Sequence, residues 1–236
     1  MSLQVTHLFK SYAGVQALQG VSFELAAGSV NALIGPNGAG KSTCFALLAG
    51  QARADAGNVI WQGINVLGLS PQARLRAGIA RTFQVAQVIE ALTVTQNVLL
   101  ALYAAKQPAS SSVFELLAQV GLAETAQHDA SALSYGAKKR LEMALALASS
   151  PSLLLLDEPA AGLNEDERHG LMALVKTLPK RGITVLYTEH NMDAVFGVAD
   201  RVLVLVDGRL LADGLPADIA MNAEVRTRYL GRNFHA

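Results

Sequence analysis

The sequence predicts an α/β fold in which a parallel β-sheet is flanked by helices, with a β region first and a helical insertion later. Three observations support this fold class. Apolar and polar residues alternate in the first 25 residues, as in half-buried strands. Short apolar segments at 30–34 and 153–156 are typical of strands buried inside a parallel sheet. Between about 74 and 131 helical patterning replaces the β signal, so strands and helices alternate around an insertion.

The individual elements follow the chain in order. Strands are expected at about 3–6, 21–25, 30–34, 153–156, 183–187 and 202–206. A helix is expected at 42–49 and ends at Gly50, since glycine readily adopts the left-handed conformation found after helices. Asn164 and Glu167 have the spacing of a capping box, which predicts that another helix begins there.

Composition narrows the classes of protein to consider. The 236 residues carry a formal net charge of zero, which disfavours a protein that coats nucleic acid, so we expect no nucleic-acid partner. A single cysteine excludes an internal disulfide and is consistent with a reducing compartment. No apolar run reaches the ~20 residues that cross a bilayer, and the N-terminus does not resemble a signal peptide. If the protein serves a membrane, we expect it to act from the cytoplasmic side.

A glycine-rich motif follows the apolar segment 30–34 and precedes the expected helix. It matches the phosphate-loop pattern, in which glycines let backbone N–H groups converge on an anion. Lys41 is expected to reach the β- and γ-phosphates of the nucleotide, and the Ser42 hydroxyl to bind Mg²⁺. The loop alone leaves kinases, GTPases, helicases and transporters as alternatives. The predicted ATP-binding residues of this loop are Gly35, Pro36, Asn37, Gly38, Ala39, Gly40, Lys41, Ser42 and Thr43.

Two adjacent carboxylates end the apolar segment 153–156. Asp157 is expected to partner Mg²⁺, usually through water, and Glu158 to polarise a water in line with the γ-phosphate. The alternative interpretation is that the two carboxylates mark the solvated end of a strand and have no catalytic role. Buried carboxylates need partners, so their position after four leucines and before Pro159 favours the catalytic reading.

The segment Leu133-Ser134-Tyr135-Gly136 resembles the signature of ABC ATPases, which lies upstream of the carboxylate strand in that family. The resemblance spans nearly the whole chain and implies a phosphate-loop NTPase core sheet, an N-terminal antiparallel β subdomain and an inserted α-helical subdomain. It divides the chain into a catalytic core with the β subdomain, residues 1–84 and 152–236, and a helical signature subdomain, residues 85–151.

Further residues gain expected roles from the resemblance alone. Tyr12 looks like the aromatic residue that stacks on adenine, and Gln84 like the glutamine that joins the Mg²⁺ site to the helical subdomain. His190 looks like the switch histidine that contacts the γ-phosphate, so that Glu158, His190 and Gln84 form the expected catalytic set. The segment Gly162-Leu163-Asn164 occupies the place of the D-loop.

The resemblance also implies partners. In ABC ATPases the signature faces the nucleotide of the other subunit, so Ser134, Tyr135 and Gly136 are expected to complete a partner's site in a head-to-tail dimer. The partner is the same chain or a paralogue. Two departures from the family pattern affect this expectation: Ala137 stands where Gln or Glu is common, and Asn164 where Asp is common.

Several segments are similar to the ATPases of branched-chain amino acid importers. They are residues 78–84, 133–136, 160–164 and 189–192. This branch implies two transmembrane permease subunits, an external solute-binding protein and a position on the cytoplasmic face of the inner membrane. Importers of urea or other amides, and soluble ABC ATPases that do not transport, remain alternatives. A regulatory subunit that only binds nucleotide is disfavoured because Lys41, Asp157, Glu158 and His190 are all present.

Overall fold

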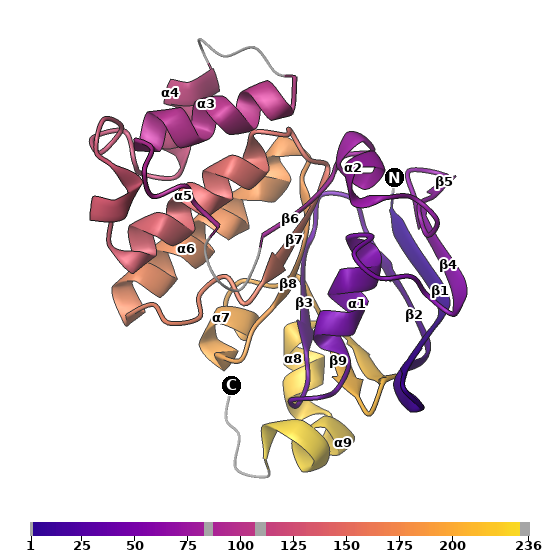
Figure 1. Cartoon of the computed structure of the whole chain (residues 1–236). Helices are drawn as coiled ribbons and strands as arrows, with labels where there is room; N and C mark the ends of the chain where they lie inside the picture. The colour runs from indigo at the N-terminus through magenta and orange to yellow at the C-terminus, as the bar shows by residue number, and fades with distance from the viewer. Residues whose placement is uncertain (1, 83–86, 107–111, 232–236) are drawn as a thin grey trace.

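The structure, a computed structural model, describes residues 2–82, 87–106 and 112–231 (Figure 1). Its strands form two sheets, one of four antiparallel strands and one of six strands. The first has the order β2-β1-β4-β5, and the second the order β10-β9-β3-β8-β7-β6. The four-stranded sheet comprises β1 (Leu3–Tyr12), β2 (Val15–Leu25), β4 (Ala56–Trp61) and β5 (Ile64–Asn65). The six-stranded sheet comprises β3 (Val30–Ile34), β6 (Ile79–Arg81), β7 (Leu153–Asp157), β8 (Thr184–Thr188), β9 (Arg201–Val206) and β10 (Arg209–Gly214).

Helices surround the sheets. They are α1 (Lys41–Leu48), α2 (Pro71–Arg76), α3 (Val94–Ala104), α4 (Ser112–Gln119), α5 (Tyr135–Leu147), α6 (Glu165–Thr177), α7 (Met192–Phe196), α8 (Pro216–Met221) and α9 (Ala223–Val225), with short helical turns at Ala130–Ala132, Leu178–Arg181 and Arg226–Leu230. Figure 1 shows α3 to α6 on one side of the six-stranded sheet, and α1 with the antiparallel sheet on the other. Within the described residues, no helix combines the length and the apolar character needed to span a bilayer.

The central strands bury both faces. In β7, Leu154 and Leu156 pack into the core shared with the helices, whereas Leu153 and Leu155 pack into the core beneath α1 and the antiparallel sheet. Successive side chains of a strand point to opposite faces, so a run of leucines fills both cores at once. The apolar segments of the sequence were therefore correctly predicted as central strands of a parallel sheet, with β3, β8, β7 and β6 paired in parallel.

Several strands differ from the sequence prediction. The first strand does not stop near Thr6 but continues to Tyr12, past a register shift at His7, whose φ of 46° places it in the left-handed region. Such a bulge breaks the two-residue alternation on which the prediction relied. The strands β4, β5 and β10 were missed. The short strand β6 was missed as well, because it lies inside the region predicted to be helical. The β6 strand has three residues and is held by pairing with β7, a contact that only the fold provides.

A buried arginine joins α1 to the chain that follows the antiparallel sheet. The guanidinium of Arg74, only 1% exposed, donates hydrogen bonds to the carbonyl oxygens at the end of α1, Leu47 and Leu48, and to that of Leu67. Burial lowers the pKa of Arg74 to about 10. These bonds satisfy carbonyls that have no partner inside a helix, and so fix the far end of the helix that follows the phosphate loop.

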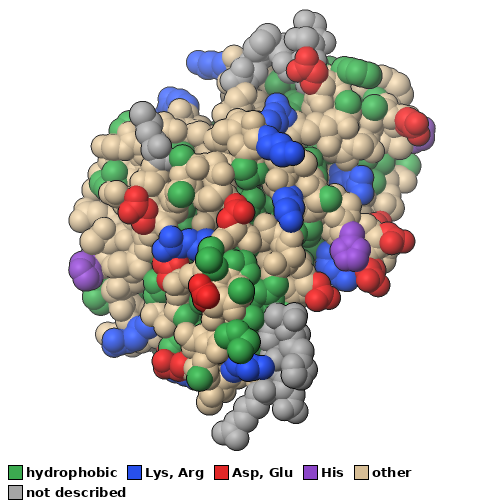
Figure 2. Space-filling model, turned by 180° about the vertical axis from the view of Figure 1, so that it is seen from behind, with side chains coloured by type: hydrophobic (Ala, Val, Ile, Leu, Met, Phe, Trp, Pro, Cys, Tyr) green, Lys and Arg blue, Asp and Glu red, His purple; other side chains and the backbone are tan. Residues whose placement is uncertain are grey.

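The surface carries charges of both signs. Figure 2 shows Lys and Arg side chains interspersed with Asp and Glu over the face seen from behind, in keeping with the formal net charge of zero. A protein whose charges are mixed in this way has no extended field of one sign over that face.

Candidate active site

The carboxyl ends of three adjacent parallel strands form the site. The β3 strand leads into the phosphate loop, β7 ends at Asp157, and β8 ends at Thr188, just before Glu189 and His190. Because β3 pairs with β8 and β8 pairs with β7, these segments, distant in the sequence, meet at one edge of the sheet. Ligands of open α/β sheets bind at this edge.

The phosphate loop depends on glycine at specific positions. Gly35 has a φ of +150°, and a Cβ there would lie 1.9 Å from the carbonyl oxygen of Leu205 on β9. Gly40 has a φ of +103° at the N-cap of α1, and its Cβ would lie 2.4 Å from the carbonyl oxygen of Ala17. Neighbouring strands therefore lie so close to the loop that only glycine, which has no Cβ, fits at these two positions.

Lys41 directs its positive charge into the loop. Its ammonium group donates hydrogen bonds to the carbonyl oxygens of Gly35 at 2.7 Å and Pro36 at 3.0 Å. Burial lowers the pKa of Lys41 below its ordinary value, while the negative charges of Glu158 and Asp157 act in the opposite direction. The three charged groups therefore interact, although they come from separate motifs.

The start of α1 is suited to an anion. Gly40 at the N-cap has no side chain to occupy the first N–H groups of the helix, whereas Ser70, Thr93 and Asn164 cap their helices with side-chain oxygens. Free N–H groups and the positive end of the helix attract phosphate. Next along α1, Ser42 is exposed and Thr43 half-buried, and Cys44 packs into the core, where burial raises the pKa of its thiol to about 12.

Asp157 is held by two donors from neighbouring strands. Its Oδ1 accepts a hydrogen bond from the Thr188 hydroxyl at 2.9 Å, and its Oδ2 accepts one from the Arg81 guanidinium at 2.7 Å. Arg81 comes from β6 and also donates to the side chain of Gln51. The carboxylate of Asp157 is thereby oriented by the strands on both sides of β7.

Glu158 has a constrained backbone. Its φ of 47° is uncommon for a residue with a side chain, and such conformations persist where the surroundings enforce them, often at functional sites. Its N–H donates to the Thr188 hydroxyl at 3.0 Å, and its Oε1 lies 2.9 Å from Nε2 of His190. Two residues assigned separate roles from the sequence are thus in direct contact.

The signature segment opens α5. Ser134 is the N-cap of this helix and its hydroxyl accepts a hydrogen bond from the N–H of Ala137 at 3.2 Å. Ser134 and Tyr135 are exposed, and Gly136 is buried against Glu167, whose Oε1 would lie 2.3 Å from an added Cβ. Among the described residues, no hydrogen bond or ion pair joins this segment to the phosphate loop of the same chain.

The D-loop candidate adjoins the signature. A Cβ added to Gly162 would lie 3.1 Å from the ring of Tyr135, so glycine allows the close approach of the two segments. Leu163 is half-buried, and Asn164 caps α6 in the predicted capping box with Glu167. The departure from Asp to Asn at this position therefore retains a good helix cap.

Two predicted residues remain, Tyr12 and Gln84. Tyr12, 47% exposed, lies at the end of β1 with the ammonium of Lys10 5.0 Å from its ring centroid. Its hairpin continues into β2, where Ala17 touches Gly40, so the exposed ring is on the strand pair beside the phosphate loop. Gln84 lies outside the described residues.

Comparisons with known proteins identify the family of this chain. A family model described as ABC transporter matches residues 18–161 of the chain. The high-affinity branched-chain amino acid transport ATP-binding protein LivG of Salmonella typhimurium shares 36% of residues over 248 positions, covering 97% of each protein. The chain belongs to the ABC transporter ATP-binding family.

Solved structures support the assignment. The ADP conformation of an ATP-binding cassette of an ABC transporter superposes with a TM-score of 0.89 at 29% identity, covering 98% of this chain and all of that one. A dimeric cassette in a post-hydrolysis state bound to ADP and phosphate gives a TM-score of 0.80 at 25% identity, covering 91% and 98%. As a member of this family, the chain is an ATPase that hydrolyses ATP to power transport.

Three site residues of this ABC ATPase were not singled out from the sequence: Arg81, Thr188 and Glu189. Thr188 and Glu189 immediately precede His190 at the end of a predicted strand, and that position was the signal available. Arg81 ends a strand too short to be recognised. Their roles depend on hydrogen bonds between strands, which spacing along the chain does not reveal.

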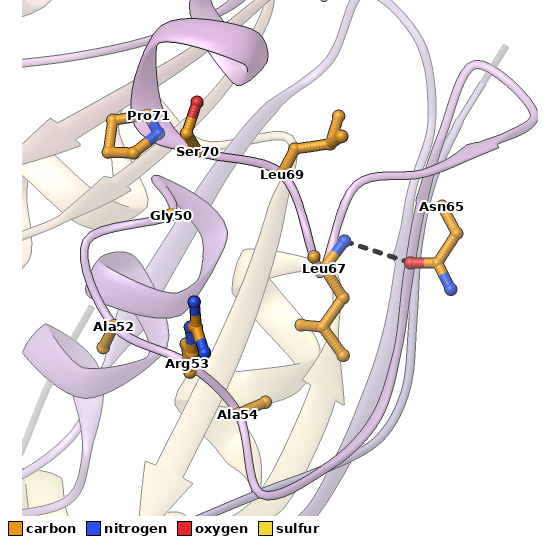
Figure 3. A pocket seen from close by; sticks show the side chains of 10 residues that line it. Gly50, Ala52, Arg53, Ala54, Asn65, Leu67, Leu69, Ser70 and Pro71 are labelled. Carbon is orange, nitrogen blue, oxygen red and sulfur yellow. Dashed lines mark hydrogen bonds between the residues drawn. The ribbon is translucent and has the colours of Figure 1, made fainter.

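A pocket of about 740 Å³ lies away from these motifs of the ABC ATPase. Figure 3 shows it between the turn that follows α1 and the loop that leads to α2, with Arg53 and Asn65 on its wall. The Asn65 Oδ1 accepts a hydrogen bond from the N–H of Leu67 at 3.0 Å. None of the residues predicted to bind ATP lines the pocket.

Proposed function

We propose that this chain is the ATP-hydrolysing subunit of an importer for a small polar solute, with branched-chain or other amino acids as its cargo. The observation that carries the ATP-hydrolysing role is the meeting of Glu158 and His190, 2.9 Å apart, at the ends of β7 and β8, which lie on one side of the strand that leads into the phosphate loop. A carboxylate and an imidazole in this position are suited to activating a water and recognising a phosphate.

Each residue has a role in this proposal. The loop N–H groups and Lys41 hold the β- and γ-phosphates, and Tyr12 stacks on adenine. Glu158 accepts a proton from the attacking water as its oxygen bonds to the γ-phosphorus and the bond to the β–γ bridging oxygen breaks. His190 steadies the γ-phosphate. These contributions are positional and electrostatic, as expected for phosphoryl transfer.

The residues present suit Mg²⁺. Asp157 and Ser42 offer a carboxylate and a hydroxyl oxygen, the ligands this hard cation prefers, and Gln84 is the third proposed ligand. Within the described residues no group of three or more His, Cys, Asp or Glu side chains gathers to hold a metal. One protein carboxylate together with substrate phosphates is the usual arrangement for Mg²⁺, which neutralises charge on the phosphates when bound.

We extend the proposal to a head-to-tail dimer, which the dimeric relative supports. Ser134, Tyr135 and Gly136 open α5, a helix of 13 residues, and the first two are exposed at its positive end. In this dimer they face the γ-phosphate bound by a partner subunit, and the D-loop residues Gly162 to Asn164 lie beside the contact. ATP closes the dimer, and hydrolysis with product release opens it.

Substitution of Glu158 tests both statements. Glu158→Gln is expected to retain ATP binding while turnover falls by about 10²- to 10⁴-fold, the range attributed to a general base. The variant is expected to accumulate as an ATP-dependent dimer, measured by light scattering with Mg-ATP. An unaltered hydrolysis rate in Glu158→Gln would overturn the assignment of the base, and a monomer under all conditions would overturn the trapped dimer.

The importer proposal draws on the relatives. LivG is named for high-affinity branched-chain amino acid transport, and the same name is borne by other relatives at 36% identity. In this proposal two permease subunits and an external solute-binding protein complete the complex, and the ATPase sits on the cytoplasmic face of the inner membrane. Residues 85–151 then act as the helical subdomain, inserted into the core formed by 1–84 and 152–236.

A groove offers a docking site for the permease. It has a volume of about 290 Å³ and a mainly apolar wall from α3 and α5, including Ala101, Ala104 and Leu145. An apolar helix of the permease that faces the cytoplasm fits such a wall. The Ala104→Glu variant is expected to lose transport while its basal ATPase rate stays near that of the wild type. Tyr103→Glu, on the same helix and 83% exposed, is the matched control.

Co-purification separates the alternatives. The tagged protein from gently solubilised membranes is expected to bring two multi-spanning permeases and a solute-binding protein, identified by mass spectrometry. The ligand of that binding protein would then name the cargo and distinguish amino acids from urea or other amides. Recovery of soluble partners alone would favour an ABC ATPase without a transport role and overturn the importer proposal.

A further inference from the structure

A buried carboxylate adjoins the proposed catalytic pair, Glu158 and His190. Glu189 is 4% exposed and follows the last residue of β8. Its Oε1 accepts a hydrogen bond from the N–H of Ala160 at 2.9 Å. Its Oε2 accepts one from the N–H of His190 at 3.0 Å and a longer one from that of Asn191 at 3.4 Å. Both oxygens therefore bind the backbone of segments that border the site.

The burial of this charge calls for an explanation. Removing a carboxylate from water is costly unless hydrogen bonds replace those to the solvent. The donors that the described part of the chain supplies are backbone N–H groups from two different loops. An apolar side chain would fill the buried space equally well. The carboxylate is therefore needed for the hydrogen bonds that join the two loops.

The hydrogen bonds of Glu189 link the segment that carries Glu158 to the segment that carries His190. Ala160 is two residues after Glu158, and the intervening Pro159 restricts the backbone. From Glu189 the chain passes to His190, whose Nε2 lies 2.9 Å from Oε1 of Glu158. The carboxylate thus fixes the backbone on both sides of the Glu158–His190 contact.

We infer that Glu189 is a positioning residue for ATP hydrolysis, which holds the Glu158 and His190 segments at the separation that the reaction needs. This inference rests on the proposed roles of Glu158 and His190. Glu189 is buried beneath the loops it joins and acts through them without touching ATP. Its loss therefore reduces the chemical step and leaves nucleotide binding by the phosphate loop, on β3 and α1, intact.

Two variants measure the effect on the full-length ATPase. Glu189→Gln keeps the shape and one acceptor oxygen, and Glu189→Ala keeps none. We expect kcat to fall by about tenfold in Glu189→Gln and by about a hundredfold in Glu189→Ala, while KM for ATP stays within about twofold, because misplacement by an ångström affects the chemical step. The partial activity of the isosteric variant keeps the test decisive if Glu189→Ala folds poorly.

A control in the same loop separates positioning from general stability. The Asn191 side chain caps α7 by accepting a hydrogen bond from the N–H of Ala194 at 2.9 Å. Asn191→Ala is expected to lower the melting temperature and leave kcat within about twofold, because the carboxylate bonds of Glu189 remain. An equal loss of kcat in Asn191→Ala and Glu189→Gln would overturn the inference.

A double variant identifies the route of action. If Glu189 acts by maintaining the Glu158–His190 contact, then Glu158→Gln combined with Glu189→Ala should hydrolyse ATP in single turnover no more slowly than Glu158→Gln alone. A further loss that multiplies would contradict the inference. If Glu158→Gln itself retains full turnover, the proposed function of the pair fails; if it loses turnover while both Glu189 variants keep kcat, only the role of Glu189 fails.

Discussion

In the proposed function the phosphate loop and the ends of β7 and β8 serve the same substrate, but they are built differently. The loop is one continuous segment whose chemistry comes from backbone N–H groups and one lysine. At the strand ends, side chains bond across about 30 positions of sequence: the Thr188 hydroxyl binds both the Asp157 carboxylate and the N–H of Glu158. One region is local, and the other exists only because two strands are paired.

The difference determines how each region tolerates change. In the loop the requirement is steric. Where a neighbouring strand comes close, only glycine fits. At the strand ends, the demand is for hydrogen-bonding groups at defined distances, and a buried donor or acceptor left without a partner is costly. Substitutions therefore break the two regions by different physical means.

The largest effect is expected in the loop. Gly35→Ala would place a Cβ 1.9 Å from the carbonyl oxygen of Leu205, so β3 and β9 could not keep their separation. We expect ATP binding to be lost, as measured by calorimetry, together with a lower melting temperature. Gly38→Ala is the matched control, because its Cβ would meet no atom within 4 Å and only the φ of +79° is disfavoured. This strain costs about 1–2 kcal/mol, so Gly38→Ala should retain measurable binding. Equal behaviour of the two variants would contradict the spatial argument.

An intermediate effect is expected at the strand ends. Thr188→Val removes the hydroxyl that binds Asp157 and accepts from the N–H of Glu158, and leaves this N–H without that acceptor. Loss of this acceptor from the part-buried N–H should lower the free energy of unfolding by about 1 kcal/mol, the low end of the range for buried groups. We expect kcat to fall by about ten- to a hundredfold through misplacement of Glu158, with ATP affinity retained.

Thr188→Ser keeps the hydroxyl and is the control for the preceding variant. It should retain most of the wild-type kcat, measured under the same saturating Mg-ATP. A similar loss in the serine and valine variants would show that the methyl group matters, and would argue against the hydrogen bonds as the cause.

The smallest effect is expected at the D-loop cap. Asn164→Ala removes the side chain that accepts from the N–H of Glu167 at 2.9 Å, and should cost about 1 kcal/mol of unfolding free energy by urea denaturation. Asn164→Asp should restore the cap. ATP affinity of the single subunit should be unchanged in both, since neither touches the phosphate loop; a loss of affinity in Asn164→Ala would link the cap to the loop.

Much of the fold was predictable from local pattern. Leucine and valine runs correctly indicated the central strands, and the capping box of Asn164 and Glu167 correctly marked the start of α6. Elements that depend on partners were not predictable. The β6 strand is only three residues long, and the bulge at His7 interrupts the alternation of β1. In both cases pairing with another strand, rather than the pattern along the chain, maintains the element.

The candidate site divides in the same way. The phosphate loop and the adjacent carboxylates were predicted from their spacing, and the structure places them at one edge of the sheet, beside His190. The roles assigned to Tyr12, Ser134 and Gly162 stay predictions, because they depend on nucleotide and on a second subunit. Arg81, Thr188 and Glu189 emerged only from contacts between strands.

By itself, the sequence determined the phosphate loop, the order of the motifs and the apolar strands beneath them, because backbone geometry and hydrophobic burial act on contiguous residues. The tertiary structure decided which polar groups orient one another: the pairing of β7 with β8 sets Thr188 against Asp157 and Glu158, and Glu189 against Ala160. Such hydrogen bonds form only when strands that are distant in the sequence come within a few ångströms of each other. Burial of both faces of the sheet brings these strands together.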